Sequence, residues 1–145
     1  ISFMQDINRV FMYHGAEHKA INCVESGDDL TVLNVRKHSR YHKRCGTSFL
    51  FIVMLISIVL FMFLHFDSVW LRLLSRLLLV PVVAGISYEF IRLAGNSDAK
   101  IINILSKPGM WFQNFTTNEP DDSMIECAIR SLELVLPSEK GKDAW

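Results

Sequence analysis

Two histidines near the start of the chain have the spacing of a metal site. His14 and His18 stand at the two ends of the pentapeptide HGAEH. In a helix, residues four apart lie on one face about one turn from each other, so both imidazoles can reach one cation. Glu17 completes the pattern H-x-x-E-H, the inverted zinc-protease motif, in which the histidines bind the metal and the glutamate is the general base. The alternative is a pair of surface histidines, because so short a motif also occurs by chance.

Further residues are candidates to complete such a site. His42 and Cys45 form H-x-x-C, a spacing that lets both side chains reach one ion from a single turn, although a basic loop with an incidental cysteine is the simpler interpretation. Glu89 is a carboxylate in an apolar segment, where it needs a metal or Arg92, three residues further on, as its charge partner. Zinc fits histidine with carboxylate or thiolate. The predicted metal ligands are His14, His18, Glu89, Cys45 and His42, with Glu17 as the catalytic base.

Other clusters have simpler explanations. Glu25 falls on the same helical face as the two histidines, and Asp121 and Asp122 stand where carboxylates favour the start of a helix rather than a hard-cation site. We expect Cys23 and Cys127 to be core residues. Three cysteines without a C-x-x-C pair argue against a disulfide framework, and the chain has neither a glycine-rich phosphate loop nor G-x-S-x-G.

The distribution of charge predicts a membrane hairpin. The mean hydropathy is +0.25, and residues 47–66 contain no formally charged side chain, enough for a helix of ~30 Å that matches a bilayer core. A buried helix of a soluble domain is the alternative, but such helices are seldom apolar on every face. A second apolar segment, 69–94, includes Pro81, which a packed membrane helix tolerates. The short linker between the segments predicts an antiparallel hairpin, either spanning or re-entrant.

Basic residues predict the orientation of this hairpin. Five lysines and arginines lie in residues 36–44, before the first span, against two arginines after the turn. We therefore expect a multi-pass protein of the plasma membrane with both termini in the cytoplasm and the lipid bilayer as its partner. Glu89 would then return to the face that holds Cys45. Fifteen basic and fifteen acidic residues give zero net charge, which argues against nucleic acid as a partner.

The remaining segments predict an all-α protein: an integral membrane hairpin with a cytoplasmic N-terminal helix and C-terminal amphipathic helices. Spacings of three and four predict a helix over 4–24 that ends near Gly27, and Thr31 is the expected N-cap of a short second helix. After the hairpin, a short helix is expected to stop at Pro108 and Gly109, and an amphipathic helix to follow at 122–136. The expected regions are 1–46, 47–95, 96–136 and a flexible tail at 137–145.

Four blocks of sequence carry a family resemblance. They read RVFMYHGAEHKAINC, LTVLNVRKHSRYHKRCGTSFLFIVML, SRLLLVPVVAGISYEFIRLAG and PGMWFQNFTTNEPDD. Together they resemble the C-terminal part of the YqhQ-like family of bacterial membrane proteins, described as predicted metal-dependent enzymes of unknown function. The resemblance implies membrane location and metal use without naming a reaction. Its signature residues would be His14, Glu17, His18, Arg44, Cys45, Gly46, Glu89, Arg92, Glu119, Pro120 and Asp121.

Family members also have a preceding N-terminal half with a glycine-rich motif and further membrane segments. Because this chain begins at Ile1 and has no counterpart of that half, we expect it to be a fragment. The missing half, or another membrane protein, is accordingly an expected partner. An active site that needs that half would be incomplete here.

Two functions from different classes fit these features. The first is a membrane-embedded, metal-dependent enzyme, hydrolytic, acting on a peptide or lipid-linked substrate at the cytoplasmic membrane face. The second is a non-catalytic membrane scaffold, in which a structural zinc site of four protein ligands (His14, His18, His42, Cys45) clamps the N-terminal helix to the hairpin. Three protein ligands with an open position indicate catalysis, whereas four indicate structure. A transporter would need polar residues within the spans, and Ser57 alone is little support.

Overall fold

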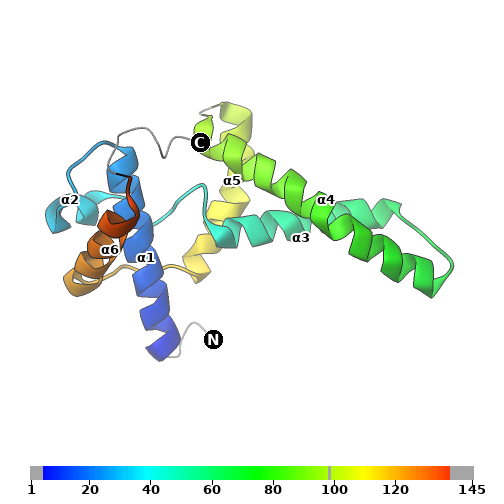
Figure 1. Ribbon diagram of the computed structural model, residues 1–145, viewed down its shortest axis with the longest axis horizontal. Coiled ribbons are helices and arrows are strands. Elements are labelled where there is room, and N and C mark those ends of the chain that lie inside the picture. The colour runs from blue at the N-terminus through cyan, green and yellow to red at the C-terminus, as the bar shows by residue number, and fades with distance from the viewer. Residues whose placement is uncertain (1–4, 98, 138–145) are drawn as a thin grey trace. The chain divides into compact units, whose positions relative to one another are not determined.

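The chain is helical in the part that this computed structural model describes, residues 5–97 and 99–137, where no strand occurs (Figure 1). An all-α fold is therefore confirmed. The chain divides into two compact units: residues up to 42 together with those from 113 onward, and residues 43–112. The predicted tail lies outside the described residues from position 138 onward, and so does Asp98.

The first unit is built on the helix that carries the two histidines. It consists of α1 (Gln5–Glu25), α2 (Val32–Lys37), the 3-10 helix η1 (Gln113–Phe115) and α6 (Asp122–Val135). α1 packs against both α2 and α6, and α2 also packs against α6. Their shared core consists of Ala16, Ala20, Cys23, Val35, Met124, Ile125 and Ile129. Because two of the α1 residues are alanines, α6 can approach the α1 backbone closely.

The helix ends in this unit follow from the sequence. Gly27 has a φ of 80°, and its N–H donates to the Val24 carbonyl at 2.9 Å, which is how a glycine terminates a helix such as α1. Thr31 caps α2 and accepts the Asn34 N–H at 3.3 Å. Asp121 caps α6 and accepts the Met124 N–H at 3.0 Å. These predicted start and stop signals are confirmed, as is the interpretation of Asp121 as a cap.

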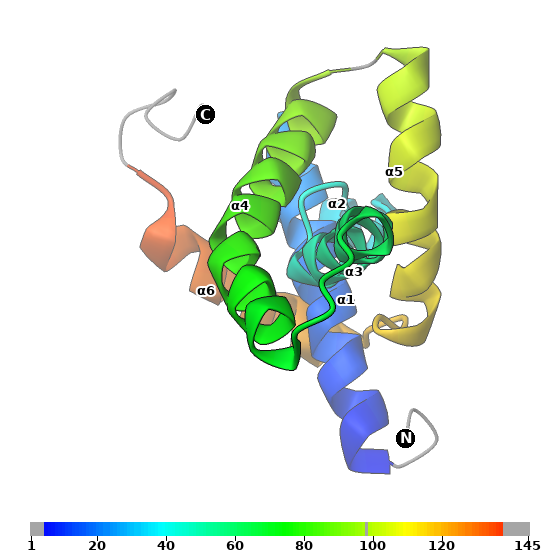
Figure 2. The same ribbon diagram turned by 90° about the vertical axis from the view of Figure 1, so that its right-hand side faces the viewer.

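The second unit contains the apolar segments. It consists of α3 (Gly46–Phe63), α4 (Val69–Asn96) and α5 (Lys100–Phe112). α3 packs against α4 and α5, which lie on its two sides when α3 is seen end-on (Figure 2). Among the described helices, α3 and α4 are long and apolar enough to cross a membrane. α3 ends three residues before the predicted limit of 66, and α4 continues through Pro81 to two residues beyond 94.

The predicted end of the helix after the hairpin is wrong. Pro108 and Gly109 were expected to stop it, but α5 continues to Phe112 with Pro108 inside. Proline removes one backbone hydrogen bond from a helix interior, and packing on α3 compensates for that loss. The Phe112 ring stacks on Phe51 with centroids 5.5 Å apart. A Cβ on Gly109 would lie 3.1 Å from the Cβ of Ser48, so this glycine serves close approach rather than termination.

The two cysteines of the first unit behave differently. Cys23 is fully buried, as predicted, and burial, followed by the charges of Asp28 and Asp29, raises the pKa of its thiol. Cys127 is exposed, so its prediction as a core residue is wrong. The core face of α6 carries Ile125 and Ile129, and Cys127, midway between them along the chain, lies outside that face.

Candidate metal centre

His14 and His18 lie side by side on α1, as their spacing predicts. Their ring centroids are 4.4 Å apart, and a ring nitrogen of each lies within 4.8 Å of one on the other. His14 is partly buried and His18 is only 3% exposed. The interpretation of this pair as solvent-facing surface histidines is therefore wrong for His18.

Each of these imidazoles is held by a backbone carbonyl. Nδ1 of His14 lies 2.8 Å from the carbonyl oxygen of Thr116, and Nδ1 of His18 lies 2.6 Å from that of Arg40. A carbonyl oxygen can only accept a hydrogen bond, so Nδ1 carries the proton and, in the neutral ring, Nε2 carries the lone pair. Histidines that bind metals almost always donate their other N–H to a carbonyl or carboxylate in this way. The pair is thus oriented as metal ligands are.

The carbonyl that orients His18 belongs to a loop that α1 side chains hold in place. Lys19 is 5% exposed, and its ammonium donates to the carbonyls of Arg36 at 3.2 Å and His38 at 2.9 Å. The Asn22 amide donates to the carbonyls on either side of Arg40, those of Ser39 at 2.7 Å and Tyr41 at 3.0 Å. A carboxylate oxygen of Glu119 lies 3.0 Å from Nζ of Lys19 and balances its charge. One face of α1 thereby fixes the loop.

A second loop, residues 116–119, provides the carbonyl that orients His14. The Arg40 guanidinium donates to the Thr117 carbonyl at 2.7 Å, and the Asn118 N–H donates to the Phe11 carbonyl at 2.9 Å. Gly15 lies directly beneath this loop, and a Cβ there would overlap the Asn118 carbonyl oxygen. The glycine inside the HGAEH motif is therefore required for the close approach of the loop, a role that the motif alone does not predict.

His42 lies in the same unit as the pair. It is 8% exposed, and its ring centroid is 5.8 Å from that of His18. Nε2 of His42 lies 3.2 and 3.3 Å from the two carboxylate oxygens of Glu25. The backbone N–H and carbonyl of His42 both bond to the side-chain amide of Gln113, at 2.9 and 2.7 Å. Gln113 is fully buried, and its role is not predictable from the sequence because a lone glutamine forms no motif.

Residues 1–138 match the family described as "Protein of unknown function (DUF1385)". The chain belongs to the DUF1385 family. It is 44% identical over 131 residues to "Uncharacterized protein YqhQ" of Bacillus subtilis (strain 168), an alignment that covers 90% of this chain and 41% of that protein. This DUF1385 chain therefore spans less than half the length of that relative. No solved structure matches it. The resemblance that the four sequence blocks predict is confirmed.

Two predicted ligands of this DUF1385 chain belong to the second unit. Cys45 is buried at the start of α3, where its sulfur accepts the Thr47 N–H at 3.4 Å. Cys45 follows His42 by three residues, so the Cα atoms of the two residues lie within ~11 Å of each other. Glu89 lies 3.6 Å from Arg92 one turn further along α4, and its side chain is 59% exposed. The ion pair considered as the alternative for Glu89 is thus present, and a role as ligand stays a prediction.

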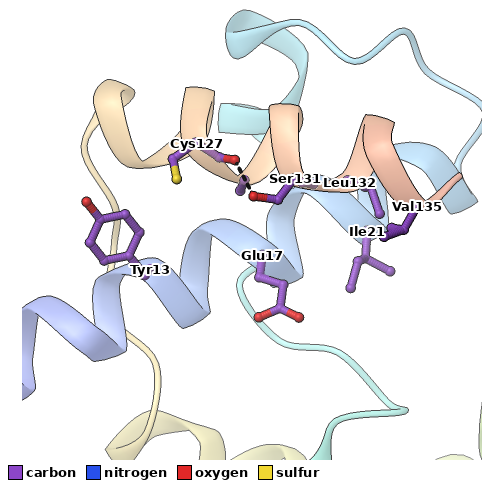
Figure 3. Close-up of a pocket in the computed structure, with 9 residues that line it drawn as sticks. Tyr13, Glu17, Ile21, Cys127, Ser131, Leu132 and Val135 are labelled. Carbon is purple, nitrogen blue, oxygen red and sulfur yellow. Dashed lines mark hydrogen bonds between the residues drawn. The ribbon is translucent and has the colours of Figure 1, made fainter.

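Glu17, the predicted base, faces a different surface of α1. It is exposed and lines a pocket of about 390 Å³ between α1 and α6 (Figure 3). In an α-helix it is rotated by about 100° from His18. The structure therefore brings together His14, His18 and His42 in the first unit, with Glu17 on the neighbouring face.

Proposed function

We propose that this chain binds one zinc ion through His14, His18 and Cys45, and that the ion serves hydrolysis at the cytoplasmic face of a membrane. One observation carries the proposal: both imidazoles donate Nδ1–H to backbone carbonyls, which directs their Nε2 lone pairs to a cation. A surface histidine pair has no need for two carbonyl partners supplied by two different loops.

The separation of the rings suits one zinc ion. With Zn–N bonds of about 2.0–2.1 Å and a tetrahedral angle, the centroids of two imidazoles on one ion come to lie about 5 Å apart. The observed 4.4 Å is close to that value, so small side-chain rotations would accommodate the ion. An anionic third ligand, a thiolate or a carboxylate, would balance part of the charge of the dication that a neutral imidazole pair leaves uncompensated.

Cys45 is our choice for that third ligand over Glu89. Chain connectivity keeps Cys45 near His42, whose ring neighbours that of His18. Glu89 already has Arg92 as its charge partner. Three protein ligands would leave one coordination position open, which is the arrangement of catalytic zinc.

Hydrolysis is the reaction that this set of residues serves best. Zinc supplies a Lewis acid that polarises the scissile group and lowers the pKa of water. Glu17 would take the proton of the attacking water only if that water lies between the histidine pair and the rim of the α1–α6 pocket, because Glu17 lies on the neighbouring face of α1. A peptide bond near the membrane surface is the first substrate class to test, followed by a lipid-linked group.

Burial supports the membrane part of this proposal. Within the apolar windows of α3 and α4, only 6% of the described residues are buried. A core helix of a soluble protein would be mostly buried, and the exposed apolar side chains of these two helices need lipid or another protein to cover them. The eighteen residues of α3 span ~27 Å, close to a bilayer core. The basic residues at 36–44 favour a cytoplasmic location for both termini and for the histidine pair.

The structural-zinc scaffold is the second candidate, and His42 favours it. The Glu25 carboxylate beside Nε2 orients this ring as carboxylates orient zinc-binding histidines, and Gln113 fixes its backbone on both sides. If His42 joined the other three ligands, the site would be closed and could not bind substrate. The coordination number therefore separates the two functions.

Cobalt substitution tests the ligand set. The full chain loaded with Co²⁺ should give the visible spectrum of a four-coordinate ion with a thiolate charge-transfer band, and Cys45→Ser should remove that band. His42→Ala should leave the spectrum of a catalytic site largely unchanged and should alter that of a structural site. Hydrolysis is then tested with zinc-loaded chain on a mixture of quenched fluorescent peptides. Glu17→Gln should abolish cleavage while metal is retained, and Glu126→Gln, an exposed carboxylate on α6, is the control.

A further inference from the structure

The pocket between α1 and α6 has the features of a small-molecule site. Its volume of about 390 Å³ lies within the range of ligand pockets, which are mostly apolar with a few polar groups. α1 contributes Tyr13, Glu17 and Ile21, and α6 contributes Cys127, Ser131 and Leu132 (Figure 3). None of these is a ligand of the proposed zinc ion.

The shape of the pocket indicates an elongated ligand. Tyr13, Glu17 and Ile21 follow one another at intervals of four residues along one face of α1, a distance of ~12 Å in total. Ile21 and Leu132 supply an apolar wall at one end. An aliphatic chain fits such a wall, because it buries apolar surface without leaving a polar group unpaired.

The carboxylate of the pocket favours a hydrogen-bond donor from the ligand. Among the described residues that line it, Glu17 is the only one that carries a charge, and a carboxylate can only accept. The Ser131 hydroxyl donates to the Cys127 carbonyl at 2.9 Å, so its oxygen offers lone pairs to the pocket. A primary ammonium has three donors and a charge opposite to that of Glu17, whereas an anionic head group would be repelled.

We propose that this pocket binds a small aliphatic primary amine in its ammonium form, with the ammonium on Glu17 and the chain along Ile21 and Leu132. This site goes beyond the metal centre and does not depend on it. It shares Glu17 with the proposed hydrolysis, however, and an ammonium there would occupy the base. A bound amine would therefore inhibit any reaction in which Glu17 takes up a proton.

The exposed thiol of Cys127 gives a direct assay of occupancy, because Cys23 and Cys45 are buried. The rate at which iodoacetamide alkylates Cys127 in the full chain would be measured by mass spectrometry, with increasing n-octylamine and, separately, n-octanoate. We expect octylamine to slow alkylation and octanoate, which has an aliphatic chain of similar length but an anionic head, to have little effect. Loss of the charged hydrogen bond in Glu17→Gln should weaken the protection by octylamine about tenfold.

Three variants make the outcome decisive. Glu126→Gln removes a carboxylate next to Cys127 that does not line the pocket, and should leave protection unchanged. Ser131→Trp fills the pocket from an exposed position and should abolish protection. His14→Ala/His18→Ala should protect as the native chain does, so failure of the zinc site leaves this test intact. Equal protection by octylamine and octanoate, or undiminished protection in Glu17→Gln, would overturn the proposal.

Discussion

Gly15→Ala tests whether the two loops around the histidines form part of the metal site. An added Cβ would overlap the Asn118 carbonyl oxygen, and both partners are backbone or rigidly attached to it, so the 116–119 loop must move. Overpacking of this kind costs about 1–3 kcal/mol. Alanine also favours a helix over glycine by about 1 kcal/mol, which offsets part of that cost. The expected net loss of stability is therefore about 2 kcal/mol or less.

The effect on metal binding should be clearer than the effect on stability. The displaced loop carries the Thr116 carbonyl, which lies 2.8 Å from Nδ1 of His14 and orients its ring. Loss of such an orienting partner typically weakens metal affinity by about 10–100-fold. Gly85→Ala is the matched control, since it places the same methyl group in a helix where nothing lies within 4 Å.

The assay is a competitive zinc titration of the two variants and the native chain, with helix content followed by circular dichroism. Gly85→Ala should bind zinc as the native chain does. If Gly15→Ala also bound zinc with native affinity, the orienting role of the loop would be refuted, whatever the change in stability.

Three further outcomes follow from the contacts of individual side chains. Glu89→Gln should leave zinc affinity unchanged in the same titration, because Arg92 is its charge partner, and a tenfold or greater loss would restore Glu89 as a ligand. Lys19→Met should lower the free energy of unfolding by about 1–3 kcal/mol, measured by denaturant titration, because it leaves the part-buried carbonyls of Arg36 and His38 without their donor. Hydrogen bonds from Ser123 and the Met124 N–H lower the pKa of Asp121. The stability they provide is present above the unfolded-state pKa of about 3.9 and is lost as pH falls through the lower folded-state value, so Asp121→Ala should flatten the stability profile in that acidic range.

Local signals in the sequence were sufficient to predict most of the helices. The α1 spacing, the Gly27 stop and the Thr31 and Asp121 caps each depend on residues within one or two turns, and all of them are confirmed. The stop at Pro108 failed because its outcome depends on packing with α3, from a segment more than forty residues away. Sequence periodicity reports only on residues that are close together in the chain, so it cannot predict a contact between α5 and α3.

Of the candidate site, the sequence predicts the histidine pair but not the groups that orient it. The histidine spacing was visible because it is a property of one helix, whereas the carbonyls of Arg40 and Thr116 belong to loops that leave no residue-type signal. Gln113 and Gly15 were missed for the same reason, since what matters is the backbone that each one contacts. The pocket beside Glu17 requires two helices from opposite ends of the chain, and no local pattern predicts it.

The zinc content of the purified full chain, measured by elemental analysis against protein concentration, shows most directly whether His14 and His18 bind a metal. We predict one zinc per native chain, none in His14→Ala/His18→Ala with helix content retained, and one in His65→Ala, a control histidine in the linker between α3 and α4. Zinc stoichiometry in the double variant equal to that of the native chain would show that these two imidazoles do not bind the metal.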